Sequence, residues 1–431
     1  MKITIIGTGF VGVVTAAVYA SLGHQVTGLD IDKKKIKSLQ KSQVPFYEPQ
    51  LTNLLKQQQQ QKRLKFTTSY AQAVKNAELV IIAVGTPSAP DGQADLSYVF
   101  ASCESLALYL KKQTIVAIKS TVPPGTLDQV KQKINQARQQ QKLSKIKYYL
   151  AALPEFLREG SAVQDTLKPD RVLIGTENSQ VFQKLQKLHQ PFKAPIVQMK
   201  PASAQMAKYA ANAYLATRIT FANQIADLCQ KNGADIEEVL TGIGLDKRIG
   251  PHYWYPGLGY GGSCFPKDVK ELAAYSRAIG EGDNILNKVN QINENRIPKL
   301  MRQFAKKLAG WQNKVVAVLG LSFKPHTDDL REAPATKVIP ILLQAGAKVN
   351  SYDPMAQYSP PTSTNYQQFK KIKTACQDAD VIIALIEWPE ILSFDFSQVK
   401  TKKHQWFIDA RNQFKPKQLE KLGYDYLGIG R

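Results

Sequence analysis

The chain has 431 residues, of which 57 are Lys or Arg and 35 are Asp or Glu, so its net charge at pH 7 is +22. At roughly 150 residues per domain this length predicts two or three domains, and a hydrophobic content of 43% excludes a chain that is disordered throughout. The excess of positive charge predicts a polyanionic partner, an anionic substrate or only a solvated basic surface.

Neither export nor membrane insertion is expected. No apolar run approaches the roughly 20 residues of a membrane helix, and the first residues have the pattern of a strand and not of a signal peptide. The four cysteines lie far apart without a CxxC pair, which argues against a disulfide scaffold or a cysteine-rich zinc site and favours the cytoplasm. The histidines are also scattered, so no metal site is predicted.

The first ninety residues alternate apolar runs with helical patterns. A strand over residues 2–6 leads into a Gly-x-Gly-x-x-Gly segment, and an apolar helix is followed by a strand over residues 25–29 that ends at Asp30. This order is a βαβ unit. The glutamine tract at residues 57–61 is interpreted as an exposed helix end. Further strands predict a doubly wound, mostly parallel sheet to about residue 195, namely residues 79–84, 115–119, 148–152 and 171–175.

The glycine segment and Asp30 together predict a dinucleotide site. Gly7, Gly9 and Gly12 would permit a tight turn, the close approach of a pyrophosphate and close packing of helix on strand. The N-terminus of the helix then faces the phosphates. Asp30 would accept hydrogen bonds from a ribose 2′-hydroxyl and repel a 2′-phosphate, so NAD is favoured over NADP.

Two later strands end in polar turns. Thr121 follows the strand over residues 115–119, and Glu155 follows the strand over residues 148–152. The carboxyl ends of the strands are the usual ligand edge of such sheets. Glu155 is therefore a candidate base, although each segment taken alone indicates only a turn.

A long helix is predicted in the middle of the chain. The helical pattern runs without a break over residues 201–231 and ends at Gly233, which gives about 45 Å at 1.5 Å per residue. Such a helix suits a spine that joins two domains or two subunits. Lys208 and Asn212 are one turn apart on it and share a face. A cation and an amide donor there could stabilise an oxyanion, but on these residues alone a solvated helix face is the favoured interpretation.

The most informative segment is a glycine-rich loop with a cysteine. Residues 257–268 have the sequence GLGYGGSCFPKD, and more helix is predicted from Pro266 to about Leu308. Cys264 would lie near the N-terminus of that helix with Lys267 close by, and both features favour a thiolate. We therefore interpret Cys264 as a nucleophile. The other cysteines have the pattern of small buried hydrophobic residues, namely Cys103, Cys229 and Cys376.

The last third of the chain repeats the opening pattern. A strand over residues 314–319 meets Gly320, a helix follows at about residues 335–344, and the next strand ends at Asp353. Only one glycine is present, but Lys324 and Arg331 suggest either a phosphate site or surface cations. The predicted fold is two Rossmann-like doubly wound domains joined by a long central helix and a helical dimerisation region. Its three parts are residues 1–198, 199–309 and 310–431.

At this point the motifs match a family. GTGFVG, STVPPGT, PEFLREGSAVQDTLKPDR, the Lys208/Asn212 helix, GYGGSCFPKD and FKPHTDDLREAP occur in one order and span nearly the whole chain. Together they resemble the UDP-glucose 6-dehydrogenase family of nucleotide-sugar dehydrogenases. GDP-mannose dehydrogenases look similar, and the branch acting on UDP-N-acetylmannosamine differs more in the cysteine loop. Leu153 departs from the small or polar residue of many members, which puts a contact by that side chain in doubt but not one by its backbone.

The resemblance implies an NAD-dependent four-electron oxidation of UDP-glucose to UDP-glucuronate, which uses two NAD⁺ and one water. Cys264 would attack the intermediate aldehyde, and the resulting thiohemiacetal would be oxidised to a thioester. Lys208, supported by Asn212, would stabilise the oxyanion, and Asp268 would hold the water or lysine network. Glu155 with Thr121 would position or activate water for hydrolysis.

The resemblance also implies the binding residues. Besides Gly7, Gly9 and Gly12, the NAD contacts would be Val11, Asp30, Lys35, Thr86, Thr121, Glu155, Lys267 and Arg331. The sugar-nucleotide contacts would be Ala152, Leu153, Pro154, Glu155, Lys208, Asn212, Tyr253, Trp254, Tyr255, Pro256, Gly257, Gly261 and Lys324. Arg248 resembles an arginine that reaches a neighbouring subunit's substrate, so a homodimer or a higher homo-oligomer through the central helix is expected.

Two other functions compete with this one. A two-electron hydroxyacid dehydrogenase could share the N-terminal half and the long helix, but it needs neither Cys264 nor a second nucleotide half. A nucleic-acid binder is motivated only by the charge of +22, and no recognition module or aromatic-basic stripe supports it. No specific nucleic-acid partner and no membrane association are therefore expected. GDP-mannose, or another nucleotide sugar oxidised by the same mechanism, remains the alternative substrate.

Overall fold

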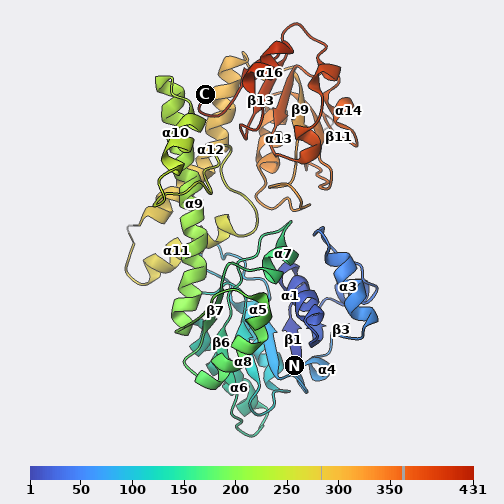
Figure 1. Ribbon diagram of the computed structural model, residues 1–431, viewed down its shortest axis with the longest axis vertical. Helices are drawn as coiled ribbons and strands as arrows, with labels where there is room; N and C mark the ends of the chain where they lie inside the picture. Colours follow the sequence, from blue (N-terminus) through green and yellow to red (C-terminus); the bar gives the residue numbers. More distant parts are fainter. Residues whose placement is uncertain (283, 362–364) are drawn as a thin grey trace. The chain divides into compact units, whose positions relative to one another are not determined.

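The computed structural model describes residues 1–282, 284–361 and 365–431. The chain divides into two compact units, Met1–Ala211 and Asn212–Arg431. Each unit contains one sheet of mainly parallel strands with helices packed on it (Figure 1). The long helix α9 (Pro201–Asn232) begins in the first unit and continues into the second.

The first unit is an eight-stranded sheet in the order β3-β2-β1-β4-β5-β6-β7-β8. The strands from β3 to β6 are parallel, and β7 is antiparallel to β6 through the pair Ala152 and Gly175. This confirms the predicted doubly wound sheet. The strands are β1 (Lys2–Ile6), β2 (Gln25–Leu29), β3 (Leu64–Thr67), β4 (Leu79–Ile82), β5 (Ile115–Ile118), β6 (Tyr149–Ala152), β7 (Val172–Gly175) and β8 (Ile196–Met199).

Helices cover both faces of this sheet, which is why its central strands are continuous apolar runs. Side chains of α1 (Phe10–Ser21), α3 (Leu51–Gln60) and α8 (Ser179–His189) share one core cluster, and those of α5 (Ser97–Ala107) and α6 (Thr126–Gln140) share the other. The glutamine tract ends α3 as predicted, but Gln58 is buried and not exposed. The short helices are α2 (Lys33–Gln40), α4 (Tyr70–Val74), α7 (Ala162–Leu167) and the 3₁₀ turn Gln190–Phe192.

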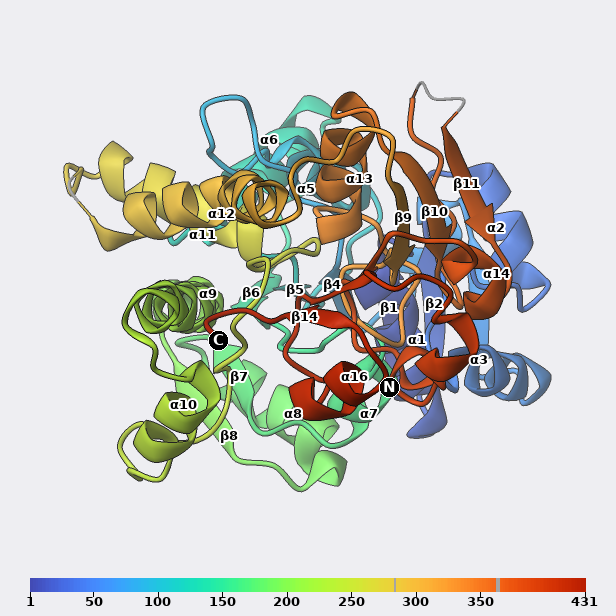
Figure 2. The same ribbon diagram turned by 90° about the horizontal axis from the view of Figure 1, so that it is seen from above.

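The central part of the chain is helical. Helix α9 ends where Gly233 takes a positive φ of 80°, and α10 (Ile236–Gly244) follows. The helical pattern predicted from Pro266 to about Leu308 is two helices, α11 (Phe265–Ala278) and α12 (Ile285–Lys307), because Gly280 takes a φ of 91° between them. The two helices lie side by side (Figure 2). No helix in the described ranges has the length and apolar character of a transmembrane span.

The second unit contains a six-stranded sheet in the order β11-β10-β9-β12-β13-β14. Counted from its first strand this is the same order as β3-β2-β1-β4-β5-β6, so the repeat predicted from the sequence is a repeat of topology. Its strands are β9 (Val315–Leu319), β10 (Lys348–Tyr352), β11 (Tyr366–Phe369), β12 (Val381–Ala384), β13 (Trp406–Asp409) and β14 (Asp425–Leu427).

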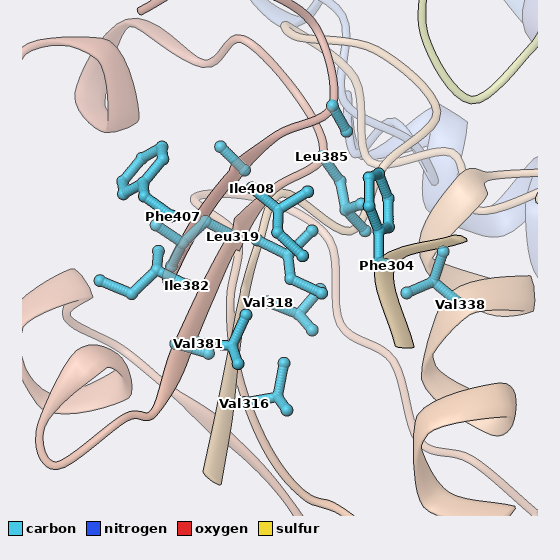
Figure 3. Packing of buried hydrophobic residues seen from close by; sticks show 14 of the residues in the cluster. Phe304, Val316, Val318, Leu319, Val338, Val381, Ile382, Leu385, Phe407 and Ile408 are labelled. Carbon is cyan, nitrogen blue, oxygen red and sulfur yellow. The ribbon is translucent and has the colours of Figure 1, made fainter. Parts of the chain in front are cut away.

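Apolar side chains of this sheet and its helices form one core. Val316 and Val318 of β9 lie on one face of the sheet with Val381 of β12, and Phe407 of β13 lies on the other face with Ile382 (Figure 3). Phe304 of α12 belongs to the same cluster, so helix α12 is part of this core. The covering helices are α13 (Pro334–Gln344), α14 (Ile372–Cys376), α15 (Pro389–Leu392), α16 (Pro416–Lys421) and the 3₁₀ turn Phe396–Val399.

Candidate active site

The three glycines after β1 have different physical reasons to be glycine. A Cβ on Gly7, whose φ is 92°, would lie 2.6 Å from the carbonyl oxygen of Ala83, and a Cβ on Gly12 would lie 1.9 Å from the carbonyl oxygen of Gly7. Packing within the chain therefore requires both. At Gly9, no described atom lies within 4 Å of the position that a Cβ would take. Gly9 leaves an open approach at the N-terminus of α1, which fits the pyrophosphate of a dinucleotide.

Asp30 lies at the end of β2 beside this loop. Its carboxylate accepts hydrogen bonds from the Thr8 backbone at 2.8 Å and the Thr8 hydroxyl at 2.9 Å, and it pairs with Lys35 at 3.1 Å. Burial raises the pKa of Asp30, but these hydrogen bonds and one from the Asp32 backbone outweigh it and leave the pKa lowered. An ionised carboxylate is what a ribose diol needs as an acceptor. The predicted NAD contacts Asp30 and Lys35 thus lie together.

In the second sheet, the site that corresponds to the dinucleotide site of the first sheet is filled by the chain's own side chains. Asp353 follows β10 as Asp30 follows β2, but its carboxylate accepts hydrogen bonds from the backbones of Leu321 and Ser322. The Trp388 indole donates to the same carboxylate at 3.2 Å, and Ser322 stands where the first sheet has the open Gly9. Both Ser322 and Asp353 are buried. The second domain has the dinucleotide topology without the open glycine cradle.

The turns after β5 and β6 hold polar groups of the first unit. The Thr86 hydroxyl donates to the Thr121 carbonyl at 2.9 Å, so these two predicted residues are adjacent. Glu155 accepts hydrogen bonds from the Lys208 ammonium at 2.9 Å and from the Leu157 backbone at 2.7 Å. Both side chains of the Glu155–Lys208 ion pair are less than one tenth exposed. Leu153 is buried in the core, which leaves only its backbone for a ligand.

The Glu155–Lys208 ion pair was not predicted, although both residues were. The sequence predicts Lys208 on one face of α9 with Asn212 and as a group that stabilises the oxyanion, but it does not predict the contact with Glu155. A further buried cation, Lys119, stands at the end of β5 and was treated only as the last residue of an apolar strand. A charged residue at the carboxyl end of a buried strand was the sequence signal that pointed to it.

Cys264 is the N-cap residue of α11 and the one exposed cysteine in the described structure. Cys103, Cys229 and Cys376 are buried as predicted, and burial raises the pKa of Cys103 and of Cys376 to about 12. Pro266 occupies the first turn of α11, where a missing backbone N–H costs nothing. The geometry gives Cys264 both accessibility and a helix N-terminus that stabilises a thiolate.

The residues after Cys264 form a charge cluster. Lys267 pairs with Asp268 at 2.6 Å and with Glu271 at 3.0 Å, and the Asn212 amide donates to Asp268 at 2.5 Å. Burial lowers the pKa of Lys267, but the two carboxylates outweigh it and raise the pKa. Since two carboxylates balance its charge, Lys267 contributes less to a Cys264 thiolate than the sequence suggested. The predicted network of Asn212, Lys267 and Asp268 is assembled in the second unit.

The loop before Cys264 is fixed from several sides. Asn293 of α12 accepts from the Tyr260 backbone N–H at 2.9 Å and donates to the Tyr260 carbonyl at 3.0 Å. The Arg296 guanidinium donates to the Gly257 carbonyl at 3.0 Å, and Asn223 of α9 accepts from the Gly257 backbone at 2.8 Å. Asn223, Asn293 and Arg296 were missed because their contacts with this loop are to backbone atoms, which no motif marks.

The other predicted NAD and substrate contacts of the second unit are placed as follows. Arg248 is exposed and pairs with Asp246 at 2.7 Å, and Arg331 pairs with Asp329 at 2.7 Å. Lys324 lies 5.7 Å from the centre of the Phe323 ring. The residues from Tyr253 to Tyr255 are aromatic, and the Trp254 indole donates to the Gly250 carbonyl at 2.8 Å. The backbone carbonyl of Arg331 accepts a hydrogen bond from the Gly262 backbone N–H at 3.1 Å, so Arg331 borders the cysteine loop.

We predict that Gly261→Ala destabilises this loop. A Cβ there would lie 2.2 Å from the backbone carbonyl oxygen of Glu332, so the two segments must separate. Overpacking of this kind costs about 1–3 kcal/mol, and it displaces Cys264 three residues later. We expect a lower thermal midpoint and a lower kcat. Gly242→Ala in α10 is the matched control, because no described atom lies within 4 Å of its Cβ position. Equal midpoints and kcat values for the two variants would contradict the prediction.

No group of three or more metal-ligating side chains occurs in the part of the chain that the structure describes. The chemistry available is that of an exposed thiol, a buried carboxylate–ammonium pair, and amide and carboxylate groups at the start of α11. Such groups suit covalent and acid–base catalysis.

Comparison with known proteins gives a match along the whole chain. Three models of the UDP-glucose/GDP-mannose dehydrogenase family match this chain. The model of the NAD binding domain matches residues 1–193, that of the central domain matches residues 202–295, and that of the UDP binding domain matches residues 317–416. The UDP-glucose 6-dehydrogenase of Pseudomonas aeruginosa is 40% identical, with 100% of this chain and 98% of that protein covered. The UDP-glucose 6-dehydrogenase TuaD of Bacillus subtilis is 39% identical, with 100% and 93% covered.

A solved structure is also similar. The UDP-glucose dehydrogenase of the hyperthermophilic archaeon Pyrobaculum islandicum superimposes with a TM-score of 0.91 at 34% identity. The match covers 99% of this chain and 97% of that one.

Proposed function

The chain belongs to the UDP-glucose/GDP-mannose dehydrogenase family, and we propose that it oxidises UDP-glucose to UDP-glucuronate in two NAD-dependent steps. It is an NAD-linked oxidoreductase. The observation that carries the four-electron reaction is Cys264, an exposed thiol at the N-terminus of α11 behind a glycine loop. A two-electron alcohol dehydrogenase has no use for such a nucleophile.

The thiol makes the second oxidation possible. The first oxidation turns the C6 alcohol into an aldehyde and releases a hydride and a proton. An aldehyde is a poor hydride donor, so Cys264 adds to its carbonyl carbon and forms a thiohemiacetal, whose C–H bond donates hydride readily. Loss of that hydride and a proton gives a thioester, and water then releases the carboxylate and the thiol. When bound, NAD⁺ accepts the hydride in each oxidation.

The buried polar groups have separate roles in this scheme. The Lys208 ammonium stabilises the oxyanion that forms at C6, and Glu155, which holds Lys208 in the free protein, activates the water that cleaves the thioester. Thr121 positions that water. On α11, Asp268 fixes the amide of Asn212 toward the oxyanion and holds Lys267. The other binding residues predicted from the sequence are proposed to contact NAD or the sugar nucleotide, as given under Sequence analysis.

Substrate choice and stoichiometry test this function. NADH production is followed with UDP-glucose, UDP-N-acetylmannosamine and GDP-mannose, and the ratio of NADH to acid product is measured. We expect turnover with UDP-glucose and a ratio of two. Turnover with GDP-mannose alone would show that the proposed substrate is wrong and leave the proposed mechanism standing. A ratio of NADH to acid product of one would support the two-electron hydroxyacid dehydrogenase.

The second unit also supports a homodimer through α9. Tyr214, Phe221 and Leu228 are seven residues apart on this helix, share one face and are each about half exposed. Spacing by seven is typical of a helix that packs on another helix. Arg248 is exposed, as a residue that reaches a partner's substrate must be. We assign residues 1–198 to NAD, 199–309 to catalysis and dimerisation, and 310–431 to the UDP-sugar, in a cytoplasmic enzyme.

Phe221→Glu tests the dimer. A carboxylate in the centre of an apolar interface is desolvated without a partner, so we expect the variant to be monomeric by light scattering, where the parent has twice the mass of one chain. Leu392→Glu is the matched control, because Leu392 is an exposed apolar residue on the second sheet's helix α15. A parent protein that is already monomeric would refute the dimer.

A further inference from the structure

Lys119 is a buried lysine that the scheme above does not use. It follows β5, and its backbone N–H donates to the Ile82 carbonyl at 2.8 Å. The residue is only 9% exposed. Within the described residues, no hydrogen-bond acceptor or ion-pair partner is present for its ammonium group. An unpaired buried ammonium is costly, so such residues are retained for function more often than for stability.

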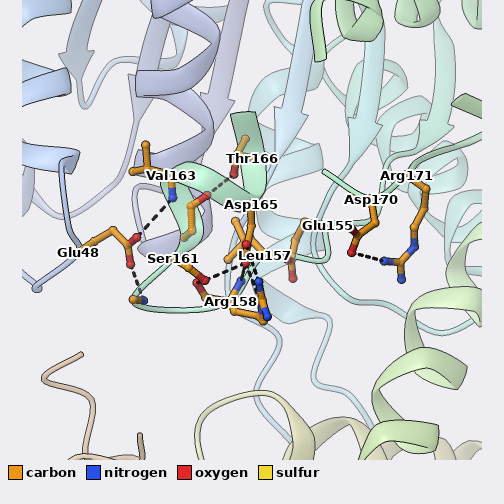
Figure 4. Close-up of polar contacts among 12 residues, drawn as sticks. Glu48, Glu155, Leu157, Arg158, Ser161, Val163, Asp165, Thr166, Asp170 and Arg171 are labelled. Carbon is orange, nitrogen blue, oxygen red and sulfur yellow. Dashed lines mark hydrogen bonds and ion pairs between the residues drawn. The ribbon is translucent and has the colours of Figure 1, made fainter. Parts of the chain in front are cut away.

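Lys119 lines a cavity of about 170 Å³ in the first unit, which is large enough for several waters. Glu155 lines the same cavity. Two other cations around it are paired, Arg158 with Asp165 at 2.8 Å and Arg171 with Asp170 at 4.0 Å, as Figure 4 shows. The titratable and charged groups that face Lys119 are Tyr19 of α1, Glu155, Arg158, Asp165 of α7, Lys168, Asp170, Arg171, His189 of α8 and Lys208 of α9.

Among these groups Lys119 changes charge near neutral pH. Burial lowers the pKa of Lys119 to about 8, while the negative charge of Glu155 raises it and the positive charge of Lys208 lowers it. Burial lowers the pKa of His189 to about 4 and raises the pKa of Tyr19. His189 and Tyr19 are therefore neutral between pH 6 and 9, and a charge that changes in this range beside Glu155 is that of Lys119.

We propose that Lys119 is a positioning residue for the oxidation, whose positive charge compensates the Glu155 carboxylate when Lys208 turns from Glu155 to the substrate oxyanion. This inference rests on the proposed function. In the free protein Glu155 and Lys208 neutralise each other. Once the Lys208 ammonium pairs with the oxyanion, two negative charges, those of the oxyanion and of Glu155, face one positive charge in a buried site. Lys119 supplies the second positive charge without touching the substrate, because electrostatic coupling acts through the cavity.

The test compares two variants that differ in charge. The parent, Lys119→Arg and Lys119→Met are assayed for kcat from pH 6.5 to 9.5 with UDP-glucose and NAD⁺. Arginine keeps the charge over this range and methionine lacks it. We expect the parent to follow the arginine variant at pH 6.5 and to approach the methionine variant at pH 9.5, with the methionine variant roughly tenfold slower at pH 6.5. Lys133→Met, a half-exposed lysine on α6, is the control and should leave the profile unchanged.

Other outcomes overturn the proposal. Identical profiles for the parent and both variants would show that the charge of Lys119 is not felt, and an arginine variant as slow as the methionine variant would show that only shape matters. The pKa is also measured directly on the parent, from the pH dependence of acetylation at Lys119 read by mass spectrometry. A value below about 6.5, at which Lys119 would be uncharged over the assayed range, would overturn the proposal even if the variants fail to fold. This labelling needs no substrate, so it separates failure of this inference from failure of the proposed function.

Discussion

Cys264→Ala should abolish net oxidation, with kcat reduced by at least about a thousand-fold. Without the thiol the aldehyde cannot become a thiohemiacetal, so the second hydride has no good donor and no thioester forms. NAD binding should persist, because the open Gly9 and the Asp30 carboxylate lie in the other unit of the chain. The measurement is NADH formation with UDP-glucose, together with NAD affinity by calorimetry.

Cys229→Ala is the matched control for this experiment. Cys229 belongs to the same unit, is buried in the core and is predicted to have no chemical role. Its removal should lower stability by about 1 kcal/mol through lost packing and leave kcat unchanged. Alkylation gives an independent check, since an exposed Cys264 should react before the three buried cysteines. Full turnover by Cys264→Ala would refute the thioester mechanism.

Glu155→Gln should stop the reaction after the second oxidation. Glutamine keeps the shape of the side chain but cannot activate water, so kcat should fall about 100- to 1,000-fold. Two NADH per subunit should form in a burst, after which the thioester accumulates on Cys264. Mass spectrometry of the Cys264 peptide detects the acyl group. Turnover without a burst and without acyl enzyme would assign the hydrolysis to another residue.

The pairing with Lys208 adds a stability prediction to the same variant. The two side chains are buried, so loss of one charge leaves the other without compensation, which costs up to about 3–5 kcal/mol. Glu155→Gln and Lys208→Met should each lower the free energy of unfolding in denaturant. The double variant should recover part of the loss, because it buries no lone charge. Lys208→Met should also lack the NADH burst, which distinguishes oxyanion stabilisation from hydrolysis.

The local features of the fold could be predicted from the sequence. The strand before Gly7 is mostly apolar and the strand before Gly320 is entirely apolar, and each begins a sheet of the predicted doubly wound type. The limits of α9 follow from Pro201 and Gly233, which begin and end helices by backbone geometry. The break between α11 and α12 was missed, although Gly280 and Gly282 lie close together there and Asn284 is the N-cap residue of α12.

The sequence alone therefore determined the order of helices and strands, the glycine loop Gly7–Gly12 after β1 and the position of Cys264 at the start of a helix. These depend on residues that are near neighbours in the chain. Only the tertiary structure showed which charged side chains of the site are paired with one another and which are buried. Glu155 meets Lys208 across 53 positions and Asn212 meets Asp268 across 56. The burial that lowers the pKa of Lys119 to about 8 comes from helices far apart in sequence. Pairing and desolvation are long-range properties of packing, and they set which of these groups is charged.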